Sequence, residues 1–134
     1  MTMQAKGSFE VKITPQPPVE GVGDPSVGRM ALEKHFQGDL VGVGKGQMLA
    51  VGTAVDGSAG YVAMERVQGT LHGREGSFAL QHHGVMNRGT PQLAITIVPD
   101  SGTDGLSGIA GALSIRIADG THYYELAYSL PDVP

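Results

Sequence analysis

The chain has 134 residues, 21 of them glycine and none of them cysteine, and its formal net charge is −4. Without cysteine there are no disulfides, no thiolate catalysis and no cysteine-ligated metal centres. The absence of a basic stripe argues against nucleic acid as a partner. No segment approaches the roughly 20 apolar residues that cross a bilayer, and the first eight residues lack the apolar core of a signal peptide. We therefore expect one domain over residues 1–134, cytoplasmic and without a membrane partner.

Eight strands are predicted, because apolar and polar residues that alternate with a period of two are typical of half-buried strands. In chain order they cover residues 5–14, 29–37, 40–54, 61–71, 77–86, 92–98, 112–118 and 121–130. Short turns such as Gly73-Arg74-Glu75-Gly76 and Asp119-Gly120 join most of them. Two longer loops, residues 15–28 and 99–111, are rich in proline and glycine. No segment has the pattern of an amphipathic helix.

Consecutive strands linked by hairpins favour a meander, and closure of a meander removes its exposed edges. The predicted fold is therefore all-β, an eight-stranded antiparallel up-and-down barrel, with a β-sandwich as the alternative. A barrel of this size is either filled by side chains or holds one small ligand. Glycines 42, 44 and 46 strip one face of the third strand, which permits sharp curvature. They also leave the register of residues 40–54 open.

Several short stretches spread over nearly the whole chain carry a family pattern. They are residues 7–11 (GSFEV), 34–40 (KHFQGDL), 52–54 (GTA), 60–67 (GYVAMERV), 71–78 (LHGREGSF), 81–84 (QHHG) and 98–103 (VPDSGT). Together they resemble an uncharacterised family of small bacterial proteins that is grouped with the allene oxide cyclase-like barrels. The resemblance implies a closed antiparallel barrel and often a homo-oligomer, a dimer or trimer. It implies no established activity, and no catalytic residue carries over from the allene oxide cyclases, which close a ring in an apolar lumen.

Three polar residues, Lys34, Glu65 and His82, share the register of apolar neighbours. Because a charge inside a barrel must be paired, hydrated or used, we predict that the three side chains project into one cavity and bind a ligand there. Burial would raise the pKa of Glu65 and make it a general base near neutral pH, with His82 as the other candidate catalytic group. Each also has a structural interpretation. Glu65 would be moved out of the inner register by a bulge, or would form an ion pair with Lys34, Arg66 or Arg116. His82 would be a hydrogen-bonded core residue, and Lys34 would reach to the rim.

Neither a metal nor a cofactor is expected. His82 and the adjacent His83 point to opposite faces of a strand and cannot hold one ion together. The histidines lack the spacing of known metal motifs, and the glycines at 42, 44 and 46 are not followed by Gly-Lys-Ser or Gly-Lys-Thr, as a phosphate loop requires.

Three functions remain open at this stage. The first is the binding of a small apolar or amphipathic ligand in the lumen. The second is an isomerase or cyclase that uses Glu65 or His82 for proton transfer. The third is a structural or interaction barrel with a filled core. The volume and lining of the barrel interior discriminate among them.

Overall fold

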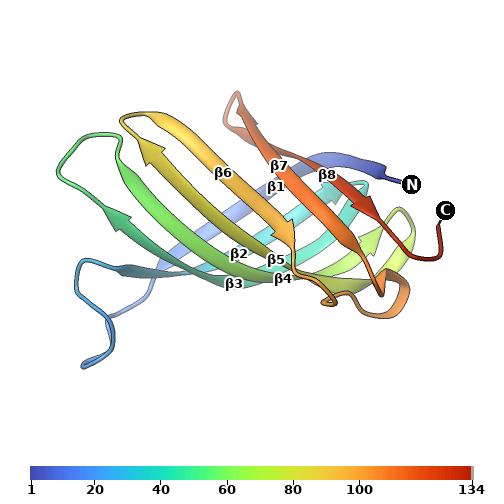
Figure 1. Cartoon of the computed structure of the whole chain (residues 1–134), viewed down its shortest axis with the longest axis horizontal. Helices are drawn as coiled ribbons and strands as arrows, with labels where there is room; N and C mark the ends of the chain where they lie inside the picture. Colours follow the sequence, from blue (N-terminus) through green and yellow to red (C-terminus); the bar gives the residue numbers. More distant parts are fainter. Residues whose placement is uncertain (134) are drawn as a thin grey trace.

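The computed structural model describes residues 1–133 and contains eight strands and one short helix (Figure 1). The strands are β1 (Met3–Pro15), β2 (Gly28–Gly38), β3 (Leu40–Gly52), β4 (Ala59–Leu71), β5 (Arg74–Asn87), β6 (Thr90–Ile97), β7 (Ala110–Ala118) and β8 (Thr121–Ser129). Each strand pairs antiparallel with the next, and β8 pairs with β1. The predicted closed eight-stranded up-and-down barrel is therefore confirmed, and the β-sandwich alternative is wrong.

The helix is the 3₁₀ turn η1 (Asp104–Leu106), which lies in the loop between β6 and β7. No helix within residues 1–133 has the length and apolar character that crossing a membrane requires.

The turn between β4 and β5 differs from the prediction. It consists of His72 and Gly73, whose φ angles of 46° and 82° are both positive, as in the two-residue turns that suit hairpins. Gly76, which the sequence suggested as the end of the turn, lies inside β5 instead. A Cβ atom there would collide with the backbone oxygen of Thr103, so this glycine makes room for the loop that carries η1. The predicted turn at Asp119 and Gly120 is confirmed, again with two positive φ angles.

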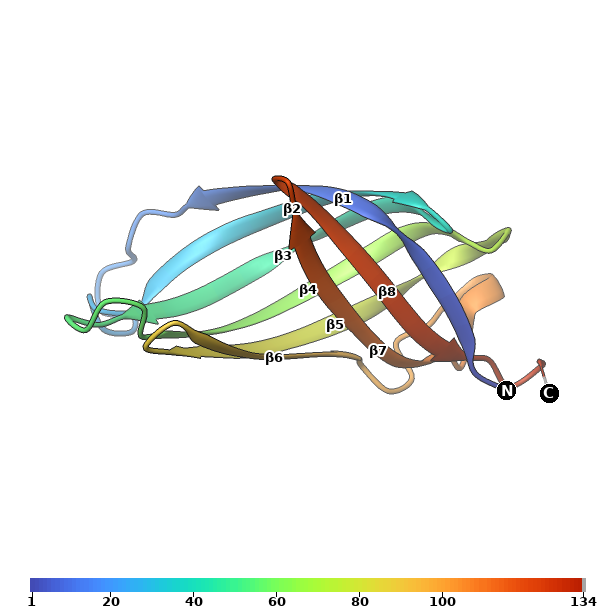
Figure 2. The ribbon, with the colours of Figure 1, turned by 90° about the horizontal axis from the view of Figure 1, so that it is seen from above.

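The two ends of the barrel differ. The β6–β7 loop lies at the end that holds both termini (Figure 2). Its residues Leu106 and Ile109 are buried. Leu40, Leu71 and Leu130 are buried beside them in the same core cluster. At the opposite end the inward-facing side chains become progressively exposed, as with Ile13, which is 48% exposed. The core therefore fills the closed half of the barrel and leaves the other half open.

The glycine-rich strand β3 has a defined register. Its even-numbered residues face inward, and Gly44 and Gly46 lie opposite Lys34 and Leu32 on β2. On its other side, Gly46 lies opposite Glu65 of β4. A side chain at Gly46 would collide with the backbone of Met64 and with Glu65, so the bare inner face of β3 lets β2 and β4 side chains meet across it.

Candidate functional site

A cavity of about 490 Å³ occupies the open half of the lumen and is lined by residues from all eight strands. Its wall is mainly apolar, with Val11, Leu32, Met48, Met86 and Ile115 among its side chains. Small inward residues, such as those at positions 50, 59 and 84, leave this space unfilled. The volume and the apolar wall are those of a typical small-molecule pocket.

Lys34, Glu65 and His82 form a polar floor beneath the cavity. Lys34 Nζ lies 3.0 Å from Glu65 Oε2, and His82 Nε2 lies 3.5 Å from the same oxygen. The side chain of Glu65 is completely buried, and the other two are nearly so. Lys34 and His82 line the cavity, whereas Glu65 lies behind them. The structure thus brings the three side chains together inside the barrel, as the shared apolar register predicted.

The charge state of Glu65 differs from the sequence-based prediction. Burial disfavours its charge and is the largest single influence, but the side-chain contact with His82 and the positive charge of Lys34 together outweigh it. The pKa of Glu65 is therefore lowered below its ordinary value, and the prediction of a raised pKa is wrong. Glu65 is therefore a carboxylate at neutral pH, and its role as a general base stays a prediction. The ion pair with Lys34 was the correct alternative.

The floor has spare hydrogen-bonding capacity. Both carboxylate oxygens of Glu65 and Nε2 of His82 are buried without a hydrogen-bond partner among residues 1–133. Lys34 Nζ is within ion-pair distance of Glu65 Oε2 but is not aligned for a hydrogen bond to it. Buried polar atoms of native proteins nearly always have a hydrogen-bond partner. These atoms lie beneath the cavity, and a further polar group can reach the floor at Lys34 and His82, the two side chains that line the cavity.

Three other polar residues line the cavity, Tyr61, Gln92 and His122. Burial, assisted by the negative charge of Glu65, raises the pKa of Tyr61, so its phenol stays protonated. The Tyr61 ring lies 6.4 Å from the His82 ring between centroids. His122 packs against Phe9, with ring centroids 5.2 Å apart. Sequence reasoning missed His122, although it shares the inward register of Tyr124 on β8 and could have been found from that.

His83 faces outward and is exposed, so the two adjacent histidines do lie on opposite faces of β5. Within residues 1–133, no three histidine, aspartate or glutamate side chains come together in a way that could hold a metal ion. The expectation of no metal and no cofactor stays a prediction.

Residues 5–128 match the family described as "Protein of unknown function (DUF3224)". The chain belongs to this family. It is 44% identical to a protein of unknown function from the DUF3224 family of Shewanella oneidensis MR-1, whose crystal structure superposes with a TM-score of 0.91 over 99% of this chain and 100% of that one. None of the curated proteins compared with the chain matches it. Membership of an uncharacterised family is thus confirmed, while the grouping with allene oxide cyclase-like barrels stays a prediction.

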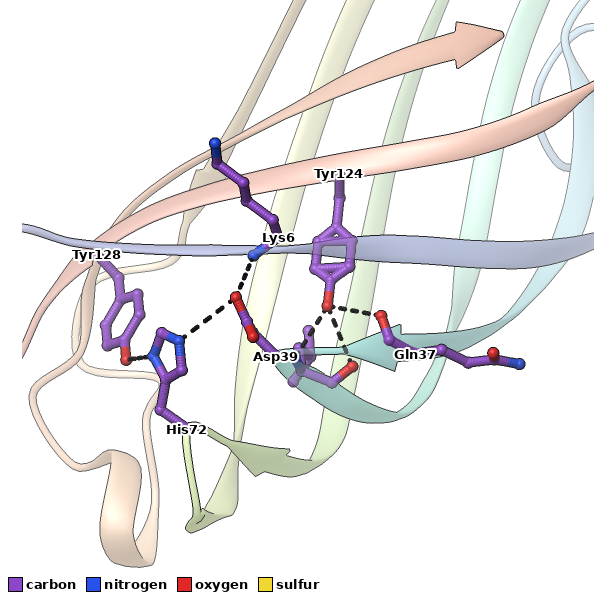
Figure 3. Close-up of polar contacts among 7 residues, drawn as sticks. Lys6, Gln37, Asp39, His72, Tyr124 and Tyr128 are labelled. Carbon is purple, nitrogen blue, oxygen red and sulfur yellow. Dashed lines mark hydrogen bonds and ion pairs between the residues drawn. The ribbon is translucent and has the colours of Figure 1, made fainter. Parts of the chain in front are cut away.

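At the closed end of this DUF3224 protein, a second polar cluster joins segments far apart in the sequence (Figure 3). The Asp39 carboxylate accepts a hydrogen bond of 2.8 Å from the backbone N–H of Lys6 and lies 3.5 Å from His72 Nε2. The other ring nitrogen of His72 is hydrogen-bonded to the hydroxyl of Tyr128. These contacts tie β1 and β8 to the turns that follow β2 and β4. None of the four residues lines the lumenal cavity, and we interpret the cluster as a structural clamp.

Tyr124 strengthens the same end from within. Its hydroxyl accepts a hydrogen bond of 2.9 Å from the backbone N–H of Leu40 and donates to the backbone oxygen of Gln37, also at 2.9 Å (Figure 3). Sequence reasoning could not find these partners, because Leu40 and Gln37 precede Tyr124 by 84 and 87 residues.

Proposed function

We propose that this protein binds a small amphipathic molecule in the open half of the lumen. The observation that carries the proposal is an apolar cavity of about 490 Å³ that ends on a buried polar floor. Small-molecule sites usually combine an apolar wall with a few convergent polar groups. In the proposed complex the apolar part of the ligand packs against Leu32, Met48 and Met86, and its polar group lies on Lys34 and His82. The cavity also argues against a barrel that is filled throughout.

The electrostatics of the floor favour an uncharged polar group on the ligand. The charge of Lys34 is already balanced by the carboxylate of Glu65, 3.0 Å away. A ligand carboxylate would bring a second negative charge close to Glu65 in a poorly solvated space, which is costly. A hydroxyl or amide both accepts and donates hydrogen bonds. It can therefore accept a hydrogen bond from Lys34 and form another with the ring of His82, the two floor side chains that line the cavity.

A second function is supported by the contact between Glu65 and His82. A carboxylate beside a histidine ring orients the ring for proton transfer, which is the logic of the hydrolase triads. His82 held in this way would move a proton on a bound ligand, as an isomerase or cyclase requires. The proposed grouping with allene oxide cyclase-like barrels points to the same class of reaction.

The outer wall bears on the expected homo-oligomer, which we retain as a proposal. Leu49, Val51, Val62, Met64 and Val85 project outward from β3, β4 and β5 and are between 37% and 52% exposed. A row of apolar side chains on an outer sheet face is typical of a surface that a second copy covers. Light scattering coupled to size-exclusion chromatography tests this proposal, and a monomer at every concentration would contradict it.

The binding proposal is tested with hexanol as the probe and calorimetry as the measurement. We expect saturable binding to the native protein and weaker binding of hexanoate. The substitution His82→Gln should weaken hexanol binding about five- to tenfold, as the loss of one hydrogen bond does. His83→Gln on the outer wall is the matched control and should leave the affinity unchanged. No saturable binding of hexanol, or an equal loss in both variants, would contradict the proposal.

The acid–base alternative has its own test. In D₂O, methyl pentyl ketone should exchange the hydrogens next to its carbonyl faster with the native protein than with the His82→Gln variant. Equal exchange rates in the two would remove the catalytic role of His82 without affecting the binding proposal.

A further inference from the structure

The barrel wall is incomplete between β6 and β7. Within the described residues these strands pair only at Ile95 with Leu113 and at Thr96 with Ala112. By contrast, every residue of β6 pairs with β5, and every residue of β7 pairs with β8. The first half of β6 and the second half of β7 therefore have a neighbour on one side only. Figure 1 shows the two strands diverging toward the open end of the barrel.

We call the unpaired gap between the first half of β6 and the second half of β7 the seam. The lumenal cavity reaches the seam from both strands. Leu93 of β6 and Ile115 and Ile117 of β7 all line it. Side chains on the inner register of a closed barrel normally fill its interior, yet Leu93 is 46% exposed and Ile117 is 64% exposed. The lumen thus opens sideways, through an apolar slot, as well as at its end.

The polar floor lies at the depth where the slot begins. His82 on β5 is paired with Ile95 on β6, and Ile95 is also the first residue of β6 from the open end that pairs with β7. A group anchored at His82 therefore stands at the apex of the slot. An apolar chain attached to that group has a continuous path from the apex along Leu93 and Ile117 to solvent.

We propose that the seam between β6 and β7 is part of the binding site, and that the ligand is a linear amphiphile. Its uncharged head lies on Lys34 and His82, and its unbranched apolar chain lies along the seam. This inference rests on the proposed lumenal binding and adds the shape of the ligand to it. A compact molecule would use the lumen alone, whereas a linear one also covers the exposed apolar side chains of the seam.

A reversible covalent closure of the seam tests the proposal, because the chain has no cysteine of its own. Continuing the β6–β7 register brings Ala94 opposite Ser114, so the double substitution Ala94→Cys/Ser114→Cys closes the seam when oxidised and opens it when reduced. The matched control is Thr96→Cys/Ala112→Cys, at a position where the strands already pair. All four side chains face outward and are exposed. Hexanol and dodecanol are the probes, and mass spectrometry verifies the oxidation state.

Each methylene that leaves water on binding tightens the affinity about fourfold. We expect dodecanol to bind at least about tenfold tighter than hexanol to the reduced protein, and to lose that advantage on oxidation. Hexanol should bind equally in both states, and the control pair should show no effect of oxidation. Equal dodecanol affinity in the two states would overturn the role of the seam and leave the lumenal proposal intact. A failure of hexanol to bind to any form would overturn both.

A second variant covers the case in which the disulfide does not form. Leu93→Gln/Ile117→Gln makes the seam polar and should lower the affinity for dodecanol much more than the affinity for hexanol, so that the advantage of dodecanol is lost. Val62→Gln, on the outer wall, is the control and should change neither affinity. Retention of the dodecanol advantage in the seam variant would refute the proposal.

Discussion

The substitution Lys34→Met tests the polar floor most severely. Methionine has a similar length, so the change removes the positive charge while it keeps most of the packing against Phe9, whose ring centroid lies 5.2 Å from Lys34 Nζ. What remains is the Glu65 carboxylate, completely buried, with only His82 beside it. The variant therefore asks how strongly the folded state depends on the pairing of one buried charge.

The magnitude follows from the geometry. Two unit charges 3.0 Å apart attract by about 5.5 kcal/mol at an effective dielectric constant of about 20. Desolvation of both charges offsets much of that attraction in the native protein, but the variant still bears the desolvation cost of Glu65 without its partner. Removal of one member of a buried pair typically destabilises by about 3–5 kcal/mol. We expect a loss of stability at the lower end of this range, because the ring of His82 still lies 3.5 Å from the Glu65 carboxylate in the variant.

The assay is urea unfolding near neutral pH, with the slope of the transition as a check that only stability has changed. Lys6→Met is the matched control. Its ion pair with Glu125 spans 3.7 Å between two side chains more than half exposed, so we expect a loss of less than about 1 kcal/mol. The double variant Lys34→Met/Glu65→Leu should recover most of the lost stability, because apolar replacements of a buried pair are often neutral.

Two results would refute the reasoning. One is a loss for Lys34→Met no larger than that for Lys6→Met, because the pair would then behave as a surface pair. The other is a double variant no more stable than the single one, because the cost would then not come from an uncompensated Glu65.

Three further predictions concern pH, a buried hydroxyl and a glycine. The pKa of Glu65 is lower in the folded protein than its ordinary value of 4.5, so the stability that its charge contributes is present above about pH 4.5 and is lost as the pH falls through the folded pKa. The free energy of unfolding of Glu65→Gln, measured in urea, should therefore depend less on pH below 4.5 than that of the native protein. The same dependence on pH in both proteins would contradict this prediction. Tyr124→Phe orphans a buried backbone N–H and should cost about 1–3 kcal/mol in urea unfolding, whereas Tyr123→Phe on the outer wall should cost almost nothing. Gly46→Ala should lower the melting temperature sharply, because the added methyl group would collide with strand β4. Gly52→Ala is the control, since its methyl group meets no atom within 4 Å and should leave the melting temperature unchanged. Equal melting temperatures of the two variants would refute the close approach at Gly46.

The barrel was predictable because its information is local. Alternation with a period of two places Phe9 inward on one strand and His82 inward on another, and the Asp119-Gly120 turn fixes a hairpin. The same alternation brought Lys34, Glu65 and His82 into one lumen, because a barrel has only one interior. The turn at His72 was missed because its conformation depends on the pairing of Leu71 with Arg74, which composition does not reveal.

The chemistry of the site was less predictable because it depends on distances between strands. Register predicts that Glu65 is buried, and burial alone raises a carboxyl pKa. The actual lowering of its pKa depends first on the contact with His82 from β5 and then on Lys34, which reaches across β3 because Gly44 and Gly46 leave that path free. The clamp formed by Asp39 and His72 is likewise beyond the reach of local patterns.

The most direct test of the lumenal site is a titration with hexanol followed by NMR of ¹³C-labelled methionine methyl groups. Met48 and Met86 line the cavity, whereas Met64 projects from the outer wall and serves as the internal control. Binding in the lumen predicts saturable shifts of the Met48 and Met86 signals, with Met64 unmoved. Shifts confined to Met64, or no saturable shift at Met48 and Met86, would contradict the claim that the lumen is the binding site.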